Sequence, residues 1–233
     1  AFAEYLALPE LALARVPDSI SLDIAGSVPT VYGTARFALE HRGGLRLDDW
    51  VLIHGASGGV GLAALQLALG KGARVIALSA SQEKRELLSA MGPVQVLDAG
   101  RADLREAILA LTGGRGVDLA LDMVGGAAFD LSIRVLAPYG RLLSIGFASG
   151  ILPVAKANIL LVKGISVIGV NYGHFLEAEP EAARIAIEQV LDAVAEGELR
   201  PTISARYPLN QISRALADLR DRKIFGKAVM SVD

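Results

Sequence analysis

The chain lacks several features that would point to particular classes of protein. Its 233 residues include no cysteine, which excludes disulfide bonds, thiolate zinc sites and a cysteine nucleophile. The formal net charge is only −2 and no basic block stands out, so we expect no nucleic-acid or acidic membrane partner. No apolar run approaches the roughly 18 residues of a membrane-spanning helix. We therefore expect no membrane segment.

The composition that remains is strongly apolar. Hydrophobic residues make up 52% of the chain, 25 residues are glycine, and the mean hydropathy is +0.44. This is typical of a sheet covered by helices on both faces, whose strands are apolar throughout. The length suits one large domain or two smaller ones. Since the chain does not begin with methionine we expect upstream residues, and since no signal peptide is recognisable we expect a cytoplasmic protein.

The stretch from Trp50 to Lys84 has the order strand, glycine turn, helix, strand. A short apolar run with β-branched members, Val51 to His54, suits a buried strand. Glycines then turn the chain into a helix that begins near Leu62, and a second apolar run follows from Arg74 to Leu78. The order predicts a βαβ unit whose first turn binds phosphate.

The glycine turn has the spacing of a dinucleotide-binding loop. Ala56-x-Gly58-x-x-Gly61 matches G-x-G-x-x-G with alanine in the first place. Gly58 would let the backbone approach a pyrophosphate, and Gly61 would let the helix pack tightly on the strand. The N–H groups and dipole at the start of the helix would supply the positive end. A glycine turn alone is weak evidence for a nucleotide site. Here the strand, loop, helix and second strand all follow one another at the sequence spacing that such a site requires.

Strands and helices alternate along most of the chain, which predicts a doubly wound parallel sheet of the Rossmann type. The expected strands are 51–54, 74–78, 94–97, 117–123, 141–145 and 165–170, and the helices between them include 81–91, 103–111, 127–136 and 158–162. Asp103 is expected to cap the helix that begins there. Before the sheet, 21–40 is expected to be helical in two parts, interrupted around Gly26 to Pro29.

The pattern changes after Tyr172. We expect a long helix over 181–196, a strand over 203–207, a helix over 210–220 capped by Asn210, and a last strand over 227–232. We assign residues 24–172 to the nucleotide-binding domain. Residues 1–23 and 173–233 are interpreted as parts of a second domain that the chain contains only in part.

The end of the second strand indicates which nicotinamide cofactor fits. An NAD site usually carries Asp or Glu there, to hold the ribose 2′-hydroxyl. This chain has Ser79, followed by Lys84 and Arg85. A hydroxyl and a cation attract a 2′-phosphate that a carboxylate would repel, so NADP is favoured over NAD. The alternative, that Lys84 and Arg85 form a solvated helix face, stays open.

Two other classes of site find no support. The Tyr-x-x-x-Lys pair of short-chain dehydrogenases is absent at all five tyrosines. The three histidines have no metal-like spacing, and His54 is interpreted as a core or loop histidine.

Motifs along the whole chain carry a family resemblance. They are AFAEYLALPE, VYGTARFAL, VLIHGASGGVGLAALQLA, the Ser81-x-x-Lys84 step, LTGGRGVDLALDMVGG, GRLLSIGFASG and FGKAVM. The sequence resembles the quinone oxidoreductase branch of the medium-chain dehydrogenase/reductase superfamily, related to zeta-crystallin. The resemblance implies that most of an N-terminal GroES-like catalytic domain precedes Ala1, with remnants of that domain at both ends of this chain.

The resemblance also implies roles for individual residues. Pyrophosphate would be held by Ser57, Gly58, Gly59 and Val60, and the 2′-phosphate by Ser79 and Lys84. The nicotinamide half would meet Val124, Gly125, Gly146, Phe147, Ala148 and Thr34. The alternatives are turn glycines at 125 and 146 and a core position for Phe147. Lys227 in FGKAVM could reach the cofactor, but an exposed strand lysine is the preferred interpretation. Thr30 stands where zinc-using relatives place a cysteine, which favours a zinc-free reductase, and Ala99 replaces an adenine-packing tyrosine of some relatives.

The implied reaction is hydride transfer from NADPH to a quinone or activated enone. No residue of this chain is assigned as acid or base, so the catalytic residues stay unknown. The alternative is a protein or fragment that binds the cofactor without catalysis. We also expect a homodimer, because Ile165 to Val170 predicts an apolar edge strand that can pair with its copy.

Overall fold

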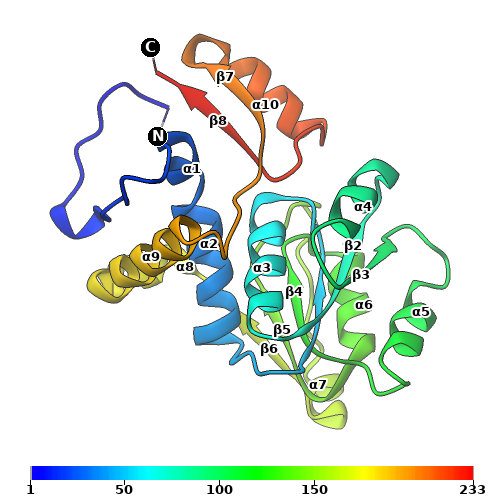
Figure 1. Ribbon diagram of the computed structural model, residues 1–233. Coiled ribbons are helices and arrows are strands. Elements are labelled where there is room, and N and C mark those ends of the chain that lie inside the picture. The colour runs from blue at the N-terminus through cyan, green and yellow to red at the C-terminus, as the bar shows by residue number, and fades with distance from the viewer. Residues whose placement is uncertain (1, 233) are drawn as a thin grey trace.

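A computed structural model describes residues 2–232 and confirms the parallel α/β fold (Figure 1). Ala1 and Asp233, the ends of the two segments assigned to a second domain, lie outside the described residues. The sheet comprises β1 (Trp50–Ile53), β2 (Arg74–Ser79), β3 (Val94–Asp98), β4 (Val117–Asp122), β5 (Leu136–Ser144) and β6 (Ser166–Gly169).

The strand order is β3-β2-β1-β4-β5-β6, and all neighbours are parallel. The chain therefore winds outward in one direction from β1 to β3 and in the other from β4 to β6. The crevice between the carboxyl ends of β1 and β4 is the place where such sheets bind ligands. The edge position predicted for the sixth strand is confirmed.

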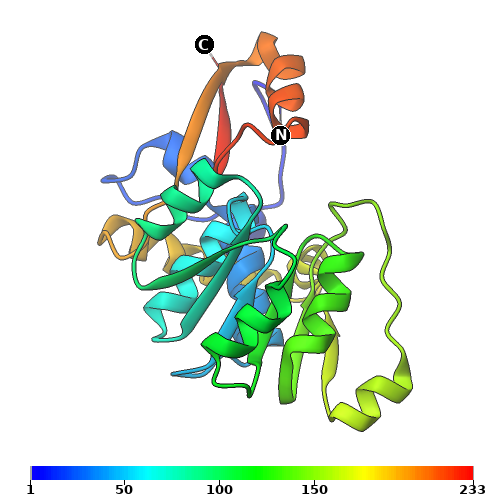
Figure 2. The same cartoon turned by 90° about the vertical axis from the view of Figure 1, so that its right-hand side faces the viewer.

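Helices cover both faces of the sheet, as the apolar strands predict. They are α3 (Gly59–Gly70), α4 (Gln82–Ser89), α5 (Leu104–Leu111), α6 (Ala127–Val135) and α7 (Ala157–Lys163). Successive residues of β1 face opposite layers, so that Val51 and Ile53 pack with α3 while Leu52 packs against the side of α5 and α6. Figure 2 shows the long connection between β5 and α7 running beside α6. No helix in the described part of the chain is long and apolar enough to cross a membrane.

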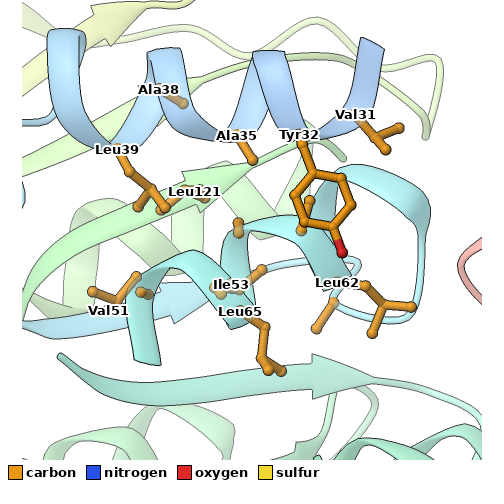
Figure 3. Packing of buried hydrophobic residues seen from close by; sticks show 14 of the residues in the cluster. Val31, Tyr32, Ala35, Ala38, Leu39, Val51, Ile53, Leu62, Leu65 and Leu121 are labelled. Atoms are coloured by element: carbon orange, nitrogen blue, oxygen red, sulfur yellow. The ribbon is translucent and has the colours of Figure 1, made fainter. Parts of the chain in front are cut away.

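The segment before the sheet forms two helices, as predicted, with the break at Val28. Ser21 caps α1 (Leu22–Ser27), and α2 (Pro29–Arg36) continues into a π-helical stretch, η2 (Phe37–Arg42). Figure 3 shows that Val31, Ala35 and Leu39 point from this helix toward α3 and the sheet. These residues form the apolar face of this helix.

The elements from Tyr172 onward form two groups, one packed on the main core and one with a small core of its own. The helices α8 (Tyr172–Ala178) and α9 (Pro180–Ala195) lie beside α2, and Ile187 and Leu191 belong to the same core as Val51. The last elements, β7 (Ile203–Pro208), α10 (Ile212–Arg220) and β8 (Lys227–Ser231), form a separate two-stranded parallel sheet with a small core of its own. The assignment of 173–233 to a second domain stays a prediction.

Helix α1, from the N-terminal segment, lies beside β8 of this small sheet (Figure 1). The guanidinium Nε of Arg206 on β7 lies 2.7 Å from the carboxylate Oδ2 of Asp23 on α1. Residues at the two ends of the sequence therefore stabilise one another. A short 3₁₀ turn, η1 (Glu10–Ala12), precedes this region.

Two predicted helix caps are wrong. Asp103 precedes α5, but both its carboxylate oxygens accept from the guanidinium of Arg101 at 2.8 Å, and its side chain makes no cap bond. A bidentate charged pair competes successfully with a single backbone N–H. Asn210 lies within the 3₁₀ turn η3 (Leu209–Gln211), so α10 begins two residues later than predicted.

Candidate cofactor-binding site

The loop between β1 and α3 leaves the start of the helix without a side-chain cap. Gly55 has a φ of 60°, and the N–H of Gly58 donates to the carbonyl of Gly55 at 3.0 Å, which closes the turn. Gly58 then precedes the helix, with no side-chain cap and no acidic residue in the first turn. The positive end of α3 therefore faces the carboxyl edge of the sheet uncompensated. Such a helix start is suited to a phosphate group.

Two glycines of the loop, Gly58 and Gly61, have different surroundings. A Cβ at Gly61 would lie 2.4 Å from the carbonyl oxygen of Gly55, so only glycine lets α3 approach β1 this closely. A Cβ at Gly58 would meet only the Gly55 carbonyl, at 3.4 Å, and Gly58 is exposed. The tight packing at Gly61 is the role that the sequence predicted, and the open space at Gly58 is compatible with the predicted approach of a pyrophosphate. The loop therefore fits a pyrophosphate.

The C-terminal segment passes over this loop, a contact that sequence reasoning missed. The N–H of Gly226 donates to the carbonyl of Ser57 at 2.9 Å, and Gly58 and Gly226 form a parallel bridge. A Cβ at Gly59 would lie 2.9 Å from Cδ of Lys227, so the stem of this lysine packs on the first turn of α3. The preferred interpretation of Lys227 as an exposed strand lysine is therefore wrong, because its side chain is half-buried against the loop.

At the end of β2, Ser79 is buried and Lys84 lies in the first turn of α4. The ammonium Nζ of Lys84 donates to the carbonyls of Arg222 and Ile224, each at 2.6 Å. Burial lowers the pKa of Lys84, and the Arg222 guanidinium lowers it further against the opposing effect of Glu83. Lys84 thus connects the nucleotide-binding domain to the loop before β8. Arg222 brings a second, exposed cation to this end of the site.

The guanidinium of Arg85 takes a different position. Its Nη1 donates to the carbonyls of Ser79 at 3.1 Å and Ala80 at 2.9 Å, and it pairs with Asp98 at 3.3 Å. Arg85 therefore holds the end of β2 against β3 and is not a freely solvated side chain. Ala99, just after β3, is exposed.

The residues predicted to meet the nicotinamide half come from two loops that contact each other. The N–H groups of Ala148 and Ser149 donate to the carbonyls of Met123 and Val124 at 3.0 and 2.9 Å. A Cβ at Gly125, where φ is 75°, would lie 3.3 Å from the Phe147 ring. Phe147 itself is 45% exposed, which excludes the alternative of a core phenylalanine. The structure thus brings 124–125 and 146–148 together at the carboxyl edge.

Thr34 and Val60 are less directly connected to these loops. The hydroxyl of Thr34 donates to the carbonyl of Thr30 at 2.6 Å, within its own helix. The α2 residue that meets the loop is Val31, whose Cγ1 would lie 2.8 Å from a Cβ at Gly59. Val60 is half-buried against the core. The two positions therefore remain predictions.

The family of zinc-binding dehydrogenases matches residues 59–192, which is more than half of the chain. The chain belongs to the medium-chain dehydrogenase/reductase superfamily, in its quinone oxidoreductase-like branch. This confirms the family expected from the sequence motifs. Within residues 2–232 of this family member, no group of three or more histidine, aspartate or glutamate residues is arranged to hold a metal ion.

Three relatives of this medium-chain dehydrogenase/reductase illustrate the likeness. A quinone oxidoreductase-like protein 2 homologue from Nematostella vectensis is 34% identical over 98% of this chain and 63% of its own. A mycobacterial protein solved in complex with NADPH is 33% identical with a TM-score of 0.92, over 100% of this chain and 71% of that one. A Pseudomonas syringae quinone oxidoreductase is 27% identical with a TM-score of 0.88, over 97% and 69%. The chain thus spans less than two thirds of the Nematostella protein's length.

Proposed function

We propose that this chain is the cofactor-binding part of an NADPH-dependent oxidoreductase that reduces a quinone or an activated enone without zinc. The observation that carries the proposal is the uncapped start of α3 behind Gly58, which fits a pyrophosphate. The relatives named quinone oxidoreductase-like, and the mycobacterial relative solved with NADPH, support the same cofactor and reaction class.

NADP is preferred to NAD because the adenosine end is cationic. Ser79 ends β2 where an NAD site usually has a carboxylate. Lys84 and Arg222 lie beside each other at this end, and both would be attracted to a 2′-phosphate. Lys84 would exchange its two carbonyl partners for phosphate oxygens, which is favourable because a charged acceptor binds an ammonium more strongly than a neutral one.

The chain's own residues would bind and orient the cofactor. The backbone of 57–60 and the start of α3 would hold the pyrophosphate, with Lys227 supplying a positive charge beside it. The loops 124–125 and 146–148 would position the nicotinamide half and exclude water. When bound, NADPH supplies the hydride that is transferred. No acid or base for the reaction is assigned to this chain, and its substrate and proton donor are to be sought in the whole protein.

The proposal is tested by titrating the 233-residue chain with NADPH and NADH. We expect NADPH to bind more tightly, and Lys84→Ala to weaken NADPH binding about tenfold or more while changing NADH binding less. Lys71→Ala is the matched control, since Lys71 lies at the far end of α3, where it pairs with Glu40. Equal preference for the two cofactors in wild type and K84A would remove the 2′-phosphate role.

A turnover assay distinguishes the proposed reductase from a protein that binds the cofactor without catalysis. The chain spans 63% of the Nematostella relative's length, so turnover is measured separately from cofactor binding. Steady-state NADPH oxidation with benzoquinone, measured on full-length protein, decides between them. Binding without turnover of quinone or enone would establish the silent alternative.

We also propose a homodimer through the β6 edge. The strand lies at the end of the sheet, and the adjacent α7 exposes Leu161 and Val162, which are 83% and 85% accessible. An unpaired edge next to exposed apolar side chains can be covered by a second copy related by a two-fold axis.

A further inference from the structure

Three buried polar side chains lie beneath the turn that connects β4 to α6. Asp122 at the end of β4, His54 after β1 and Ser132 on α6 are 1%, 4% and 0% exposed. They come from three different elements that meet at the carboxyl edge of the sheet. Buried polar groups of this kind are expensive unless each has a partner, so their hydrogen bonds show what they hold in place.

Asp122 organises the backbone of the turn. Its Oδ1 accepts from the N–H of Val124 at 2.8 Å and from the N–H of Gly125 at 2.9 Å. Val124 and Gly125 also meet the loop after β5, through the bond from Ser149 to Val124 and the close approach of Phe147 to Gly125. One carboxylate oxygen thus fixes the turn on which that neighbouring loop rests.

His54 and Ser132 attach the helix after the turn to β1. The Ser132 hydroxyl donates to the carbonyl of Ala128 at 3.0 Å, so its oxygen accepts from the Nε2–H of His54 at 2.8 Å. All three side chains are buried, which keeps them from a substrate. A hydrolase-like use of serine, histidine and aspartate is therefore excluded. The arrangement holds backbone in place.

We propose that Asp122 is a positioning residue for the nicotinamide half of the cofactor, acting through Val124 and Gly125, with His54 and Ser132 fixing the helix that follows. The inference rests on the proposed NADPH site and adds that different residues hold the two halves of the cofactor. The start of α3 and the cations Lys84 and Arg222 bind the phosphates and adenosine, whereas Asp122 positions the nicotinamide half. Removing Asp122 then affects one half of the cofactor only.

Two ligands test the role of Asp122 on the 233-residue chain, because they occupy different parts of the proposed site. Adenosine 2′,5′-bisphosphate probes the adenosine half alone, and NADPH probes both halves. We expect Asp122→Ala to weaken NADPH about tenfold, since two charge-assisted hydrogen bonds to the turn are lost, and to leave adenosine 2′,5′-bisphosphate within twofold of wild type. Asp122→Asn keeps one acceptor oxygen but loses the negative charge, so a smaller effect of the same sign is expected.

Asp118→Ala is the matched control. Asp118 lies at the other end of the same strand, where its carboxylate accepts from the N–H of Trp50 at 2.8 Å and pairs with Arg115. This variant also loses a partly buried acceptor, but it is remote from the carboxyl edge. We expect it to lower the melting temperature without changing the ratio of the two dissociation constants.

The binding measurements can contradict the inference in three ways. If D122A weakens both ligands equally, or neither, the positioning role is wrong. If D122A does not fold, as judged by circular dichroism, the ratio measured on D122N decides in its place, and an unchanged ratio there overturns the inference. If wild type binds neither ligand, the proposed cofactor site itself fails, which is distinguishable from failure of the role of Asp122.

Discussion

Acidification is expected to destabilise the protein through His54. Complete burial lowers the pKa of His54 to about 4, against the opposing effect of Asp122, whereas in the unfolded chain it is about 6.5. Between these two pH values the unfolded state binds one proton more than the folded state, so the free energy of unfolding falls as the pH falls. The contribution is fully present above pH 6.5 and is lost progressively toward pH 4.

The size of this effect follows from the shift of the pKa. A difference of about 2.5 pKa units at about 1.4 kcal/mol each corresponds to a loss of about 3 kcal/mol between pH 6.5 and 4. Since a typical domain is stable by about 5–15 kcal/mol, one histidine would account for a considerable part of acid sensitivity. No screening by solvent reduces the figure, because the imidazole is buried beside Ser132.

Urea unfolding at pH 7, 6, 5 and 4.5, followed by circular dichroism, measures the effect. The perturbation is His54→Gln, whose amide can still donate to the Ser132 hydroxyl but does not titrate. We expect wild type to lose about 2 kcal/mol or more relative to H54Q across this range. The control is His174→Gln, which replaces an exposed histidine and is expected to keep the wild-type slope. Parallel curves for wild type and H54Q would refute the reasoning.

Two further predictions concern packing and assembly. Gly61→Ala places a Cβ against the backbone of the cofactor loop, so we expect about 1–3 kcal/mol of destabilisation and weaker NADPH binding. Gly70→Ala, in the same helix with no atom within 4 Å, is expected to stabilise by up to about 1 kcal/mol, and calorimetry that ranks the two variants the other way would contradict the packing argument. For assembly, light scattering at micromolar concentration is expected to show a dimer, which the double variant Leu161→Glu, Val162→Glu converts to a monomer of unchanged melting temperature. A monomeric wild type would remove the proposed interface.

Most of the fold could be predicted because a buried parallel sheet is visible in local sequence. Short apolar runs mark its strands, as at 51–54 and 74–78, and a glycine turn separates the first of these from the next helix. The dinucleotide loop could be found for the same reason, since Gly58 and Gly61 lie three residues apart. Caps were harder to predict. Asp103 had Arg101 two residues away as a competing partner, and no spacing rule decides between them.

The parts of the candidate site that sequence reasoning missed come from distant segments. Arg222 and Gly226 reach the nucleotide-binding domain through backbone groups, namely a carbonyl that accepts from Lys84 and an N–H that donates to Ser57. Any residue except proline offers the same backbone groups, so these contacts have no side-chain pattern. The motif FGKAVM identified the segment as part of the family resemblance, but only the structure shows that it lies on the loop.

The contact between Gly226 and Ser57 also has a consequence for biosynthesis. The ribosome makes Ser57 well before Gly226, and at about 5–20 residues per second the interval is roughly 10 to 30 seconds. Strands β2 to β6 are made during that time, so the sheet can form only in its last part, when the carbonyl of Ser57 still lacks Gly226 and Lys227 is not yet beside α3. The cofactor loop is thus covered only when the last strand emerges, so a chain stalled before β8 would carry an incomplete site on an otherwise folded domain.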